Sequence, residues 1–561
     1  MNGSPPGCPK CGRRRHTLRC TIALWLAVAC TAETYPAGPQ VVTFWSNADD
    51  SDQPYAVYIP KSFDPAKKYP LVISLHGAFS NHRLNMRRIF GQGNRPREPD
   101  AEASRYFPPF RDVDYIVASP YSRGTMGYQG IAEKDVYDVL ADVKRRFSID
   151  EDRIYLTGLS MGGGGTLWLG LTRPDIWAGL APVCAAAPEG TEQLAPNALN
   201  LAVHLFHGDQ DPVVPVDVSR LWHKRFLDLG AKAEYVEYPG VRHNSWDYAY
   251  KNAAIFDWFA KFKRVRYPEH VRFVSPAYKY DSAYWVKLDG LTPGTAASID
   301  ARFTGNNTLE ITTKNLDGFT LNLAGHPKYS RDTPVAVTID GTAIKTKPLS
   351  FSKTARGWTA AHFKNSRTAK HAGAEGPISE AVAARHIYVY GTGGSPAEEE
   401  LRSRREIAAR AADWTGMAGR LAVSFAVKKD RDIDDADLAS ANLILFGTKE
   451  TSSVIARLDE HFPIQLNAGA ADYGLLFIAP AGNHYALVNS GLPWWTGSES
   501  IERPGFHPLS GPAGLLDQFG DYVLFKGSLD NVIAEGRFDR NWKLPPDVAA
   551  RMRATGAVVI K

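Results

Sequence analysis

The segment T-G-L-S-M-G-G-G-G at residues 157–165 restricts the possible folds of this 561-residue chain more than any other. It follows the strand-like run 153–156 and contains the pattern G-x-S-x-G at residues 158–162. A strand, a glycine-flanked serine and then an apolar helix indicate a sharp strand-to-helix turn. Such a turn brings backbone too close for a Cβ atom, which explains the glycines on both sides. By itself, the pattern also suits a glycine-rich turn with an incidental serine.

Strand-like runs alternate with helical patterns on both sides of this segment, from about residue 40 to 265. The predicted strands are 71–75, 115–118, 154–156, 201–206 and 234–238. Apolar residues recur at helical spacing in 136–147 and again in 255–262, where a helix closes the domain. Apolar strands that alternate with amphipathic helices predict an α/β domain over residues 40–268, with a doubly wound, mostly parallel sheet.

The pattern changes after residue 268. Residues 270–365 contain period-two runs such as 308–313 and 319–323, which predict a small antiparallel β-sandwich. Residues 380–561 return to an α/β pattern, and we expect them to form a second α/β module. Its predicted elements are strands at 387–390, 421–425 and 443–447 and a charged helix near 397–415.

Two features of the last section have the composition of binding motifs. The turn G-T-G-G at 391–394 stands between a strand and a helix, where backbone amides can hold a phosphate. Its spacing matches neither a Walker A loop nor G-x-G-x-x-G, so a plain turn is the preferred interpretation. Trp494 and Trp495 could stack on a sugar, but paired aromatics in a loop with Pro and Gly are more often structural.

The N-terminal segment has the form of a secretory signal. Three arginines at 13–15 precede the apolar run 21–29, which is too short to span a bilayer. We expect residues 1–35 to direct export to a bacterial envelope, as a secreted or periplasmic protein, with lipid attachment at Cys30 as the alternative. Four of the five cysteines lie in this segment, so we expect no disulfide framework around Cys184.

The bulk composition excludes several partners. Hydrophobic residues make up 44% and charged residues 22% of the chain, as in ordinary soluble proteins. The formal charge of +5 is small for this length and does not indicate a nucleic-acid partner. We also expect no membrane span, no metal and no cofactor. The oligomeric state does not follow from the sequence.

The residues after the central serine decide between a structural and a chemical interpretation. A serine hydroxyl becomes a nucleophile when a histidine removes its proton and an acid orients that histidine. Strand 201–206 runs into H-G-D-Q-D at 207–211, so either Asp209 or Asp211 can supply the acid. His243 follows the next strand, directly before the last helix. We therefore expect Ser160 to attack and His243 to act as base and then acid.

An oxyanion hole needs two backbone N–H groups beside the serine. Met161 follows Ser160, and the loop His76-Gly77-Ala78 ends the strand 71–75. The candidate donors are the amides of Met161 and Ala78. His76 could simply brace its loop, and His207 could be a buried core histidine.

These motifs as a set resemble the α/β-hydrolases, both the feruloyl-esterase and polyhydroxybutyrate-depolymerase-like esterases and the catalytic domain of prolyl-oligopeptidase-type peptidases. The matching motifs are His76-Gly77, G-L-S-M-G-G at 158–163, H-G-x-x-D-x-x-V-P at 207–215 and the Gly240-x-x-His243 loop. In the family pattern the second aspartate of H-G-x-x-D is the acid, so the resemblance selects Asp211. It covers residues 45–265 and implies an α/β-hydrolase fold with a Ser-His-Asp triad.

The domain order separates the two groups of relatives. Prolyl-oligopeptidase-type peptidases usually carry a large β-propeller before the catalytic domain, whereas about ten residues precede the hydrolase pattern here after the leader. We therefore expect a carboxylic ester substrate, either a small molecule or an acyl or feruloyl group on a polysaccharide. A peptidase without a propeller is the second hypothesis, and a catalytically silent binding protein of the same fold is the third. Residues 270–561 are expected to be accessory, because all proposed catalytic groups lie within 76–243.

Overall fold

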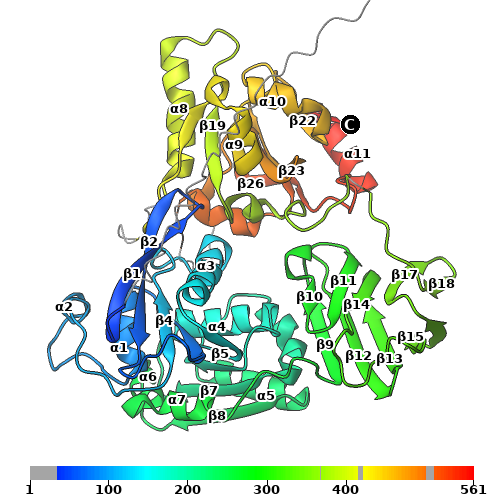
Figure 1. Cartoon of the computed structure of the whole chain (residues 1–561). Helices are drawn as coiled ribbons and strands as arrows, with labels where there is room; N and C mark the ends of the chain where they lie inside the picture. The colour runs from blue at the N-terminus through cyan, green and yellow to red at the C-terminus, as the bar shows by residue number, and fades with distance from the viewer. Residues whose placement is uncertain (1–34, 367, 415–420, 501–508, 510) are drawn as a thin grey trace, which may run out of the picture. The chain divides into compact units, whose positions relative to one another are not determined.

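The predicted parallel strands assemble into one eight-stranded sheet (Figure 1). The structure, a computed structural model, describes residues 35–366, 368–414, 421–500, 509 and 511–561, so the leader and Cys30 lie outside the described residues. The strand order is β1-β2-β4-β3-β5-β6-β7-β8. The bounds are β1 (Gly38–Ser46), β2 (Ser51–Ile59), β3 (Tyr69–Leu75), β4 (Ile116–Pro120), β5 (Ile149–Leu159), β6 (Gly179–Val183), β7 (Ala202–Gly208) and β8 (Lys232–Tyr238).

Most neighbouring strands of this sheet are parallel. The pairs β3–β4, β3–β5, β5–β6, β6–β7 and β7–β8 are parallel, whereas β1 and β2 form an antiparallel hairpin at one edge. All five predicted strands are present, and the sequence pattern missed β1, β2 and β6. The short run in β6 contains a glycine and a proline, so its sequence carries a weak strand signal. It forms a strand because β5 and β7 pair with it on both sides.

Helices cover both faces of the sheet (Figure 1). The helices α1 (His82–Ile89), α6 (Trp246–Ala249) and α7 (Ala254–Phe259) lie on one face, and their apolar residues share a buried cluster with the strands. The helices α3 (Gly130–Arg146), α4 (Met161–Thr172) and α5 (Asp217–Asp228) lie on the other. The shorter helices of this part are α2 (Asp100–Ala103), η1 (Thr191–Asn200) and η2 (Lys251–Ala253). The doubly wound, mostly parallel sheet is therefore confirmed.

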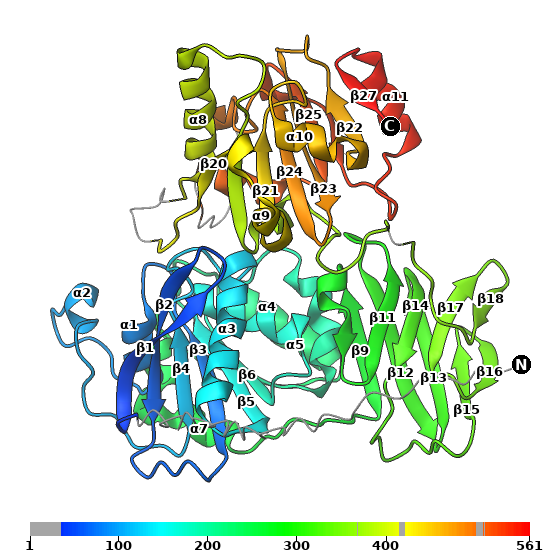
Figure 2. The ribbon, with the colours of Figure 1, turned by 45° about the horizontal axis from the view of Figure 1, so that its top comes forward.

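Two five-stranded sheets follow, and their buried residues form a single apolar cluster (Figure 2). One sheet has the order β10-β11-β14-β17-β18 and the other β16-β15-β13-β12-β9. The strands β13 and β15 are parallel, whereas the sequence predicted an antiparallel domain. Between β13 and β15 the chain forms β14 in the other sheet. It therefore enters β15 in the same direction as β13. The bounds are β9 (His270–Ser275), η3 (Tyr278–Tyr280), β10 (Ser282–Ala283), β11 (Val286–Leu291), β12 (Ala297–Gly305), β13 (Thr308–Lys314), β14 (Leu316–Leu321), β15 (Val335–Ile339), β16 (Thr342–Thr346), β17 (Ser350–Thr354) and β18 (Gly357–Thr359).

The last section contains a seven-stranded sheet with the order β20-β19-β21-β24-β23-β25-β26 (Figure 2). We call residues 378–561 the C-terminal module. The pairs β20–β19, β19–β21 and β21–β24 are parallel. The pairs β24–β23, β23–β25 and β25–β26 are antiparallel. The bounds are η4 (Ile378–Val382), β19 (His386–Tyr390), α8 (Glu398–Ala412), β20 (Val427–Lys429), η5 (Asp430–Asp432), α9 (Asp435–Ser440), β21 (Asn442–Phe446), α10 (Ser453–Leu458), η6 (Asp459–His461), β22 (Ile464–Leu466), β23 (Tyr473–Ala481), β24 (His484–Gly491), η7 (Ser498–Ser500), η8 (Ala513–Gln518), β25 (Tyr522–Lys526), β26 (Ser528–Gly536), α11 (Pro546–Ala554) and β27 (Val558–Ile560).

One prediction for this module is wrong. Residues 421–425 have no regular secondary structure, and the strand β20 begins only at Val427. The apolar side chains Leu421, Val423 and Phe425 do pack against the core of the module, which explains the alternating pattern. The backbone N–H of Ala422 donates to the carbonyl oxygen of Arg123, in the loop after β4, and not to a neighbouring strand.

The module's two candidate binding motifs have structural roles. The amide and hydroxyl of Thr392, in the glycine-rich turn, both donate to the Asp430 carboxylate, at 2.9 and 2.7 Å. A protein carboxylate thus takes the place that a phosphate would need. Trp494 and Trp495 are buried, and the indole N–H of Trp494 donates to the carbonyl of Pro512. They belong to the core.

Residues 37–561 form one compact unit. The apolar cluster of the C-terminal module also includes Ala48, Met126, Ile131 and Ala132 from the first domain. In the part of the chain that the structure describes, no helix has the length and apolar character needed to cross a membrane.

Candidate active site

Ser160 lies at the sharp turn between β5 and α4. Its backbone has φ 55° and ψ −117°, a conformation that L-residues rarely adopt and that costs roughly 1–3 kcal/mol. A Cβ on Gly162 would lie 2.3 Å from the carbonyl oxygen of Leu75, and one on Gly158 would lie 2.3 Å from the carbonyl oxygen of Gly162. Only glycine therefore allows the turn to pack against β3.

The three residues predicted to act together lie in one hydrogen-bonded chain. The Ser160 Oγ is 3.0 Å from His243 Nε2, and His243 Nδ1 is 2.7 Å from Asp211 Oδ2. The His243 side chain is 22% exposed, whereas the Asp211 side chain is fully buried. The serine follows β5, the acid follows β7 and the histidine follows β8, so parallel strands deliver all three to one edge of the sheet.

The two aspartates make different contacts in the structure. Asp211 Oδ1 accepts the backbone N–H groups of Val213 and Val214, at 2.8 and 3.0 Å, while Oδ2 faces His243. Burial alone would raise the pKa of the Asp211 carboxyl, but these hydrogen bonds, with that from His243 first among them, lower it below its usual value. Asp209 instead accepts the N–H of Gly240 at 2.7 Å and so braces the loop that carries His243.

His207 contacts Asp211, with its Nε2 3.2 Å from Asp211 Oδ2. Its ring is fully buried, with Nδ1 2.7 Å from Ser219 Oγ and Nε2 3.0 Å from the carbonyl oxygen of Val214. Burial lowers the pKa of the His207 imidazole, which favours its neutral form. The interpretation as a buried core histidine therefore describes this residue.

The loop after β3 lies directly beside the serine. A Cβ on Gly77 would lie 3.5 Å from the Cβ of Ser160. The next residue is Ala78, and Met161 is the first residue of α4. Among the described residues, no acceptor takes a hydrogen bond from the amide of Ala78 or Met161. The assignment of these two amides as oxyanion donors stays a prediction.

His76 braces this loop. Its two ring nitrogens lie 2.8 Å from the carbonyl oxygens of Gly77 and Tyr121, and the ring is fully buried. The sequence did not mark Tyr121, Thr125 and Tyr128, which also contact the loop. No motif identifies them, because each is brought to β3 only by the pairing of β3 with β4.

Comparison with known proteins agrees with this geometry. The sequence model of the phospholipase/carboxylesterase family matches residues 131–256, which include Ser160, Asp211 and His243. Residues 38–259 form an α/β-hydrolase domain. The matched stretch runs from α3 to α7, so it leaves the two five-stranded sheets and the C-terminal module outside.

Individual relatives of the hydrolase domain are distant or partial. The acyl-protein thioesterase 1 homolog 2 of Dictyostelium discoideum is 26% identical over 117 residues, which are 20% of this chain and 53% of the thioesterase. The poly(3-hydroxybutyrate) depolymerase of Ralstonia pickettii is 43% identical over 84 residues, 14% of this chain and 15% of the depolymerase. This chain thus spans about half the length of the first relative and about a seventh of the second. A thermostable esterase of known structure shares 27% identity over 40% of this chain and 63% of its own, with a TM-score of 0.33.

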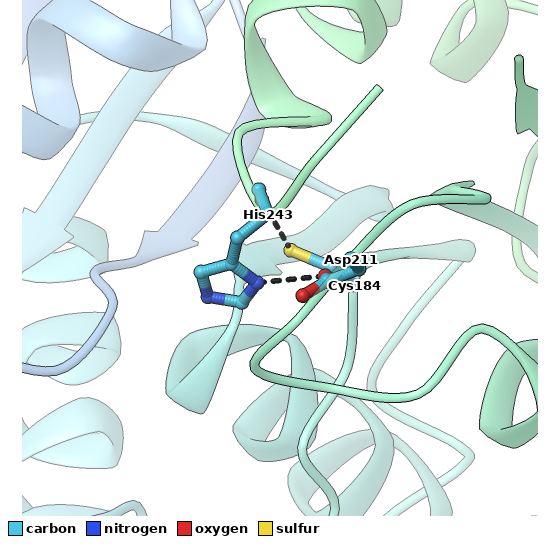
Figure 3. A group of neighbouring side chains, drawn as sticks. All are labelled: Cys184, Asp211 and His243. Atoms are coloured by element: carbon cyan, nitrogen blue, oxygen red, sulfur yellow. Dashed lines mark hydrogen bonds and ion pairs between the residues drawn. The ribbon is translucent and has the colours of Figure 1, made fainter. Parts of the chain in front are cut away.

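Cys184 completes a group of three possible metal ligands in the hydrolase domain (Figure 3). Its Sγ, an Asp211 oxygen and a His243 ring nitrogen lie within 4.8 Å of one another. The thiol faces the backbone carbonyl of His243 at 3.5 Å, and Asp211 accepts from the ring. Burial raises the pKa of the Cys184 thiol to about 12, whereas metals bind the thiolate. The neutral Cys184 thiol and the hydrogen bond between Asp211 and His243 therefore argue against a metal site here.

We expect ester hydrolysis to be unchanged after dialysis against EDTA, because a serine triad needs no Lewis acid and the possible ligands already bond one another. The measurement is the rate with p-nitrophenyl acetate before and after dialysis, with a mock-dialysed sample as control. A loss of rate that added Zn²⁺ restores would contradict this expectation.

Proposed function

We propose that this protein is a serine hydrolase that cleaves carboxylic esters through an acyl-enzyme on Ser160. The observation that carries the proposal is the continuous chain of contacts from Asp211 through His243 to Ser160. A buried ionised acid, a histidine held by it and a serine on a strained turn are the parts that activate a hydroxyl. The family match over the same residues supports the same chemistry.

The mechanism follows from the positions of these atoms. His243 Nε2 takes the proton of Ser160 Oγ while Oγ attacks the ester carbonyl carbon, and Asp211 stabilises the imidazolium. The N–H groups of Met161 and Ala78 receive the oxyanion. The tetrahedral intermediate then expels the alcohol, which takes its proton from His243. Water attacks the acyl-enzyme with His243 as base, the carboxylic acid leaves and Ser160 regains its proton.

The surroundings of the triad favour a substrate with an apolar or aromatic part. The Trp246 ring lies 5.4 Å from the His243 ring, centroid to centroid. Phe79 follows Ala78 in the oxyanion loop and is 48% exposed, and Val213, two residues after the acid, is 63% exposed. Exposed apolar side chains beside the triad suit an apolar or aryl acyl group. A feruloyl or other acyl ester of a polysaccharide is the specific substrate class we propose.

A substrate panel tests this function. We expect the purified full chain to hydrolyse feruloyl, acetyl and short aliphatic esters faster than aminoacyl-prolyl amides, measured as kcat/KM for each substrate. Faster cleavage of the amides would replace the esterase by a peptidase. The absence of turnover with every member would favour a binding protein on the same fold.

We further propose that the protein is exported to the cell envelope. The arginines at 13–15 and the apolar run 21–29 support export. N-terminal sequencing of the protein recovered from envelope and culture fractions tests this, and an intact N-terminus in the cytosolic fraction would contradict it.

A further inference from the structure

The loop that follows β4, residues 121–128, supports the oxyanion loop from behind. The carbonyl oxygen of Tyr121 lies 2.8 Å from His76 Nε2, and the Tyr128 hydroxyl donates to the carbonyl oxygen of His76 at 3.0 Å. Thr125 Oγ1 accepts the backbone N–H of Phe79 at 2.7 Å. These contacts fix His76 before Ala78 and Phe79 after it. The position of the Ala78 N–H therefore depends on this supporting loop.

The supporting loop has a strained backbone. Ser122 and Arg123 both have positive φ, 45° and 64°, and Gly124 follows with φ 95°. Such a conformation is unfavourable for any residue other than glycine and persists only where surrounding contacts hold it. The conformation that presents Thr125 to Phe79 therefore needs anchors outside the loop.

Arg123 is the first anchor, within the hydrolase domain. Its side chain is fully buried, with Nε 2.6 Å from Asp135, Nη1 2.6 Å from Asp49 and Nη2 2.6 Å from Ser46 Oγ. Two carboxylates and a hydroxyl thus fix the guanidinium in one orientation.

The second anchor comes from the C-terminal module. The N–H of Ala422 donates to the carbonyl oxygen of Arg123 at 3.1 Å, and the carbonyl of Ala422 accepts from Arg123 Nη1, also at 3.1 Å. The side chains on either side, Leu421 and Val423, pack on the core of that module, and so does Met126 of the supporting loop. The module therefore holds the strained loop by a two-way hydrogen-bonded pair and by burial of Met126.

We propose that the C-terminal module positions the oxyanion hole of the hydrolase domain, through Ala422, Arg123 and Thr125. These are positioning residues, because they act on Ala78 through the backbone and do not reach the substrate. This inference rests on the proposed esterase function. It assigns the module a part in the rate of the reaction, whereas the sequence predicted only an accessory domain.

The pair Ala422→Pro and Ala422→Ser tests this in the full chain. Proline removes the N–H that donates to Arg123, whereas serine keeps it at the same position. We expect Ala422→Pro to lower kcat about ten- to a hundredfold with little change in KM, because oxyanion contacts strengthen in the transition state. Ala422→Ser should match the wild type. Equal kcat in all three proteins, or an equal loss in both variants, would overturn the proposal.

A second pair of variants keeps the proposal testable if Ala422→Pro does not fold. Thr125→Val removes the acceptor for Phe79 N–H but keeps the side-chain volume, and Thr125→Ser keeps the hydroxyl. We expect kcat to fall in Thr125→Val and to recover in Thr125→Ser, with thermal unfolding midpoints close to that of the wild type. An unchanged kcat in a folded Thr125→Val protein would overturn the proposal. Turnover in Ser160→Ala would instead overturn the esterase function itself, so the two failures are distinguishable.

Discussion

Ser160→Ala is expected to abolish ester hydrolysis, with a fall in kcat of roughly 10⁵- to 10⁶-fold. The methyl group of alanine cannot form the acyl-enzyme, so only the weak catalysis by the oxyanion donors and by binding is left. The Oγ makes its contact with His243 at the open end of the triad, and the strained turn is held by the glycines around it. The variant should therefore fold normally. The measurement is kcat with p-nitrophenyl acetate together with a thermal unfolding curve.

The matched control for this variant is Ser298→Ala, a serine of β12 in the β-sandwich, for which we expect wild-type kcat. Comparable activity in the Ser160→Ala and wild-type proteins would show that Ser160 is not the nucleophile. The glycine-rich turn would then be structural, as the pattern by itself allows.

Asp211→Asn is expected to lower kcat by about 10⁴-fold. The Asp211 carboxylate accepts a hydrogen bond from His243 Nδ1–H, and this tautomer leaves Nε2 free to accept the hydrogen bond from Ser160 Oγ. The amide of asparagine can present an N–H to Nδ1, which favours the wrong tautomer, and it carries no charge to stabilise the imidazolium. Because hydrogen bonds hold the pKa of Asp211 below its usual value, the loss of its charge should matter throughout the neutral range.

Asp209→Asn is the control for this prediction, two residues away in the same loop. Asp209 accepts only the backbone N–H of Gly240 among the contacts the structure gives it, and asparagine retains an acceptor oxygen. We expect its kcat to stay within about threefold of the wild type, because the acceptor for the Gly240 N–H is retained. A larger loss in Asp209→Asn than in Asp211→Asn would reverse the assignment of the acid.

Much of the hydrolase domain could be predicted from the sequence because its signals are local. The run before Ser160 became β5, and the apolar spacing in 136–147 and 255–262 became α3 and α7. The strand β6 escaped prediction because its pairing, and not its composition, makes it a strand. The prediction of a strand at residues 421–425 was wrong for the opposite reason. Their alternating apolar residues pack on a core, but no strand among the described residues pairs with them.

The amino-acid sequence alone was enough to predict the turn at Ser160 and the order of Ser160, Asp211 and His243 after successive strands. Each of these predictions depends on a local pattern, because the glycines, the apolar runs and the strand ends are recognised within a few neighbouring residues. Only the tertiary structure separated Asp209 from Asp211 on physical grounds, because the hydrogen bonds that distinguish them come from Gly240 and His243 on another loop. Only the tertiary structure, likewise, brought Ala422 to Arg123, 299 positions earlier in the chain. No periodicity links residues so far apart, and their contact arises only when the C-terminal module packs against the loop after β4.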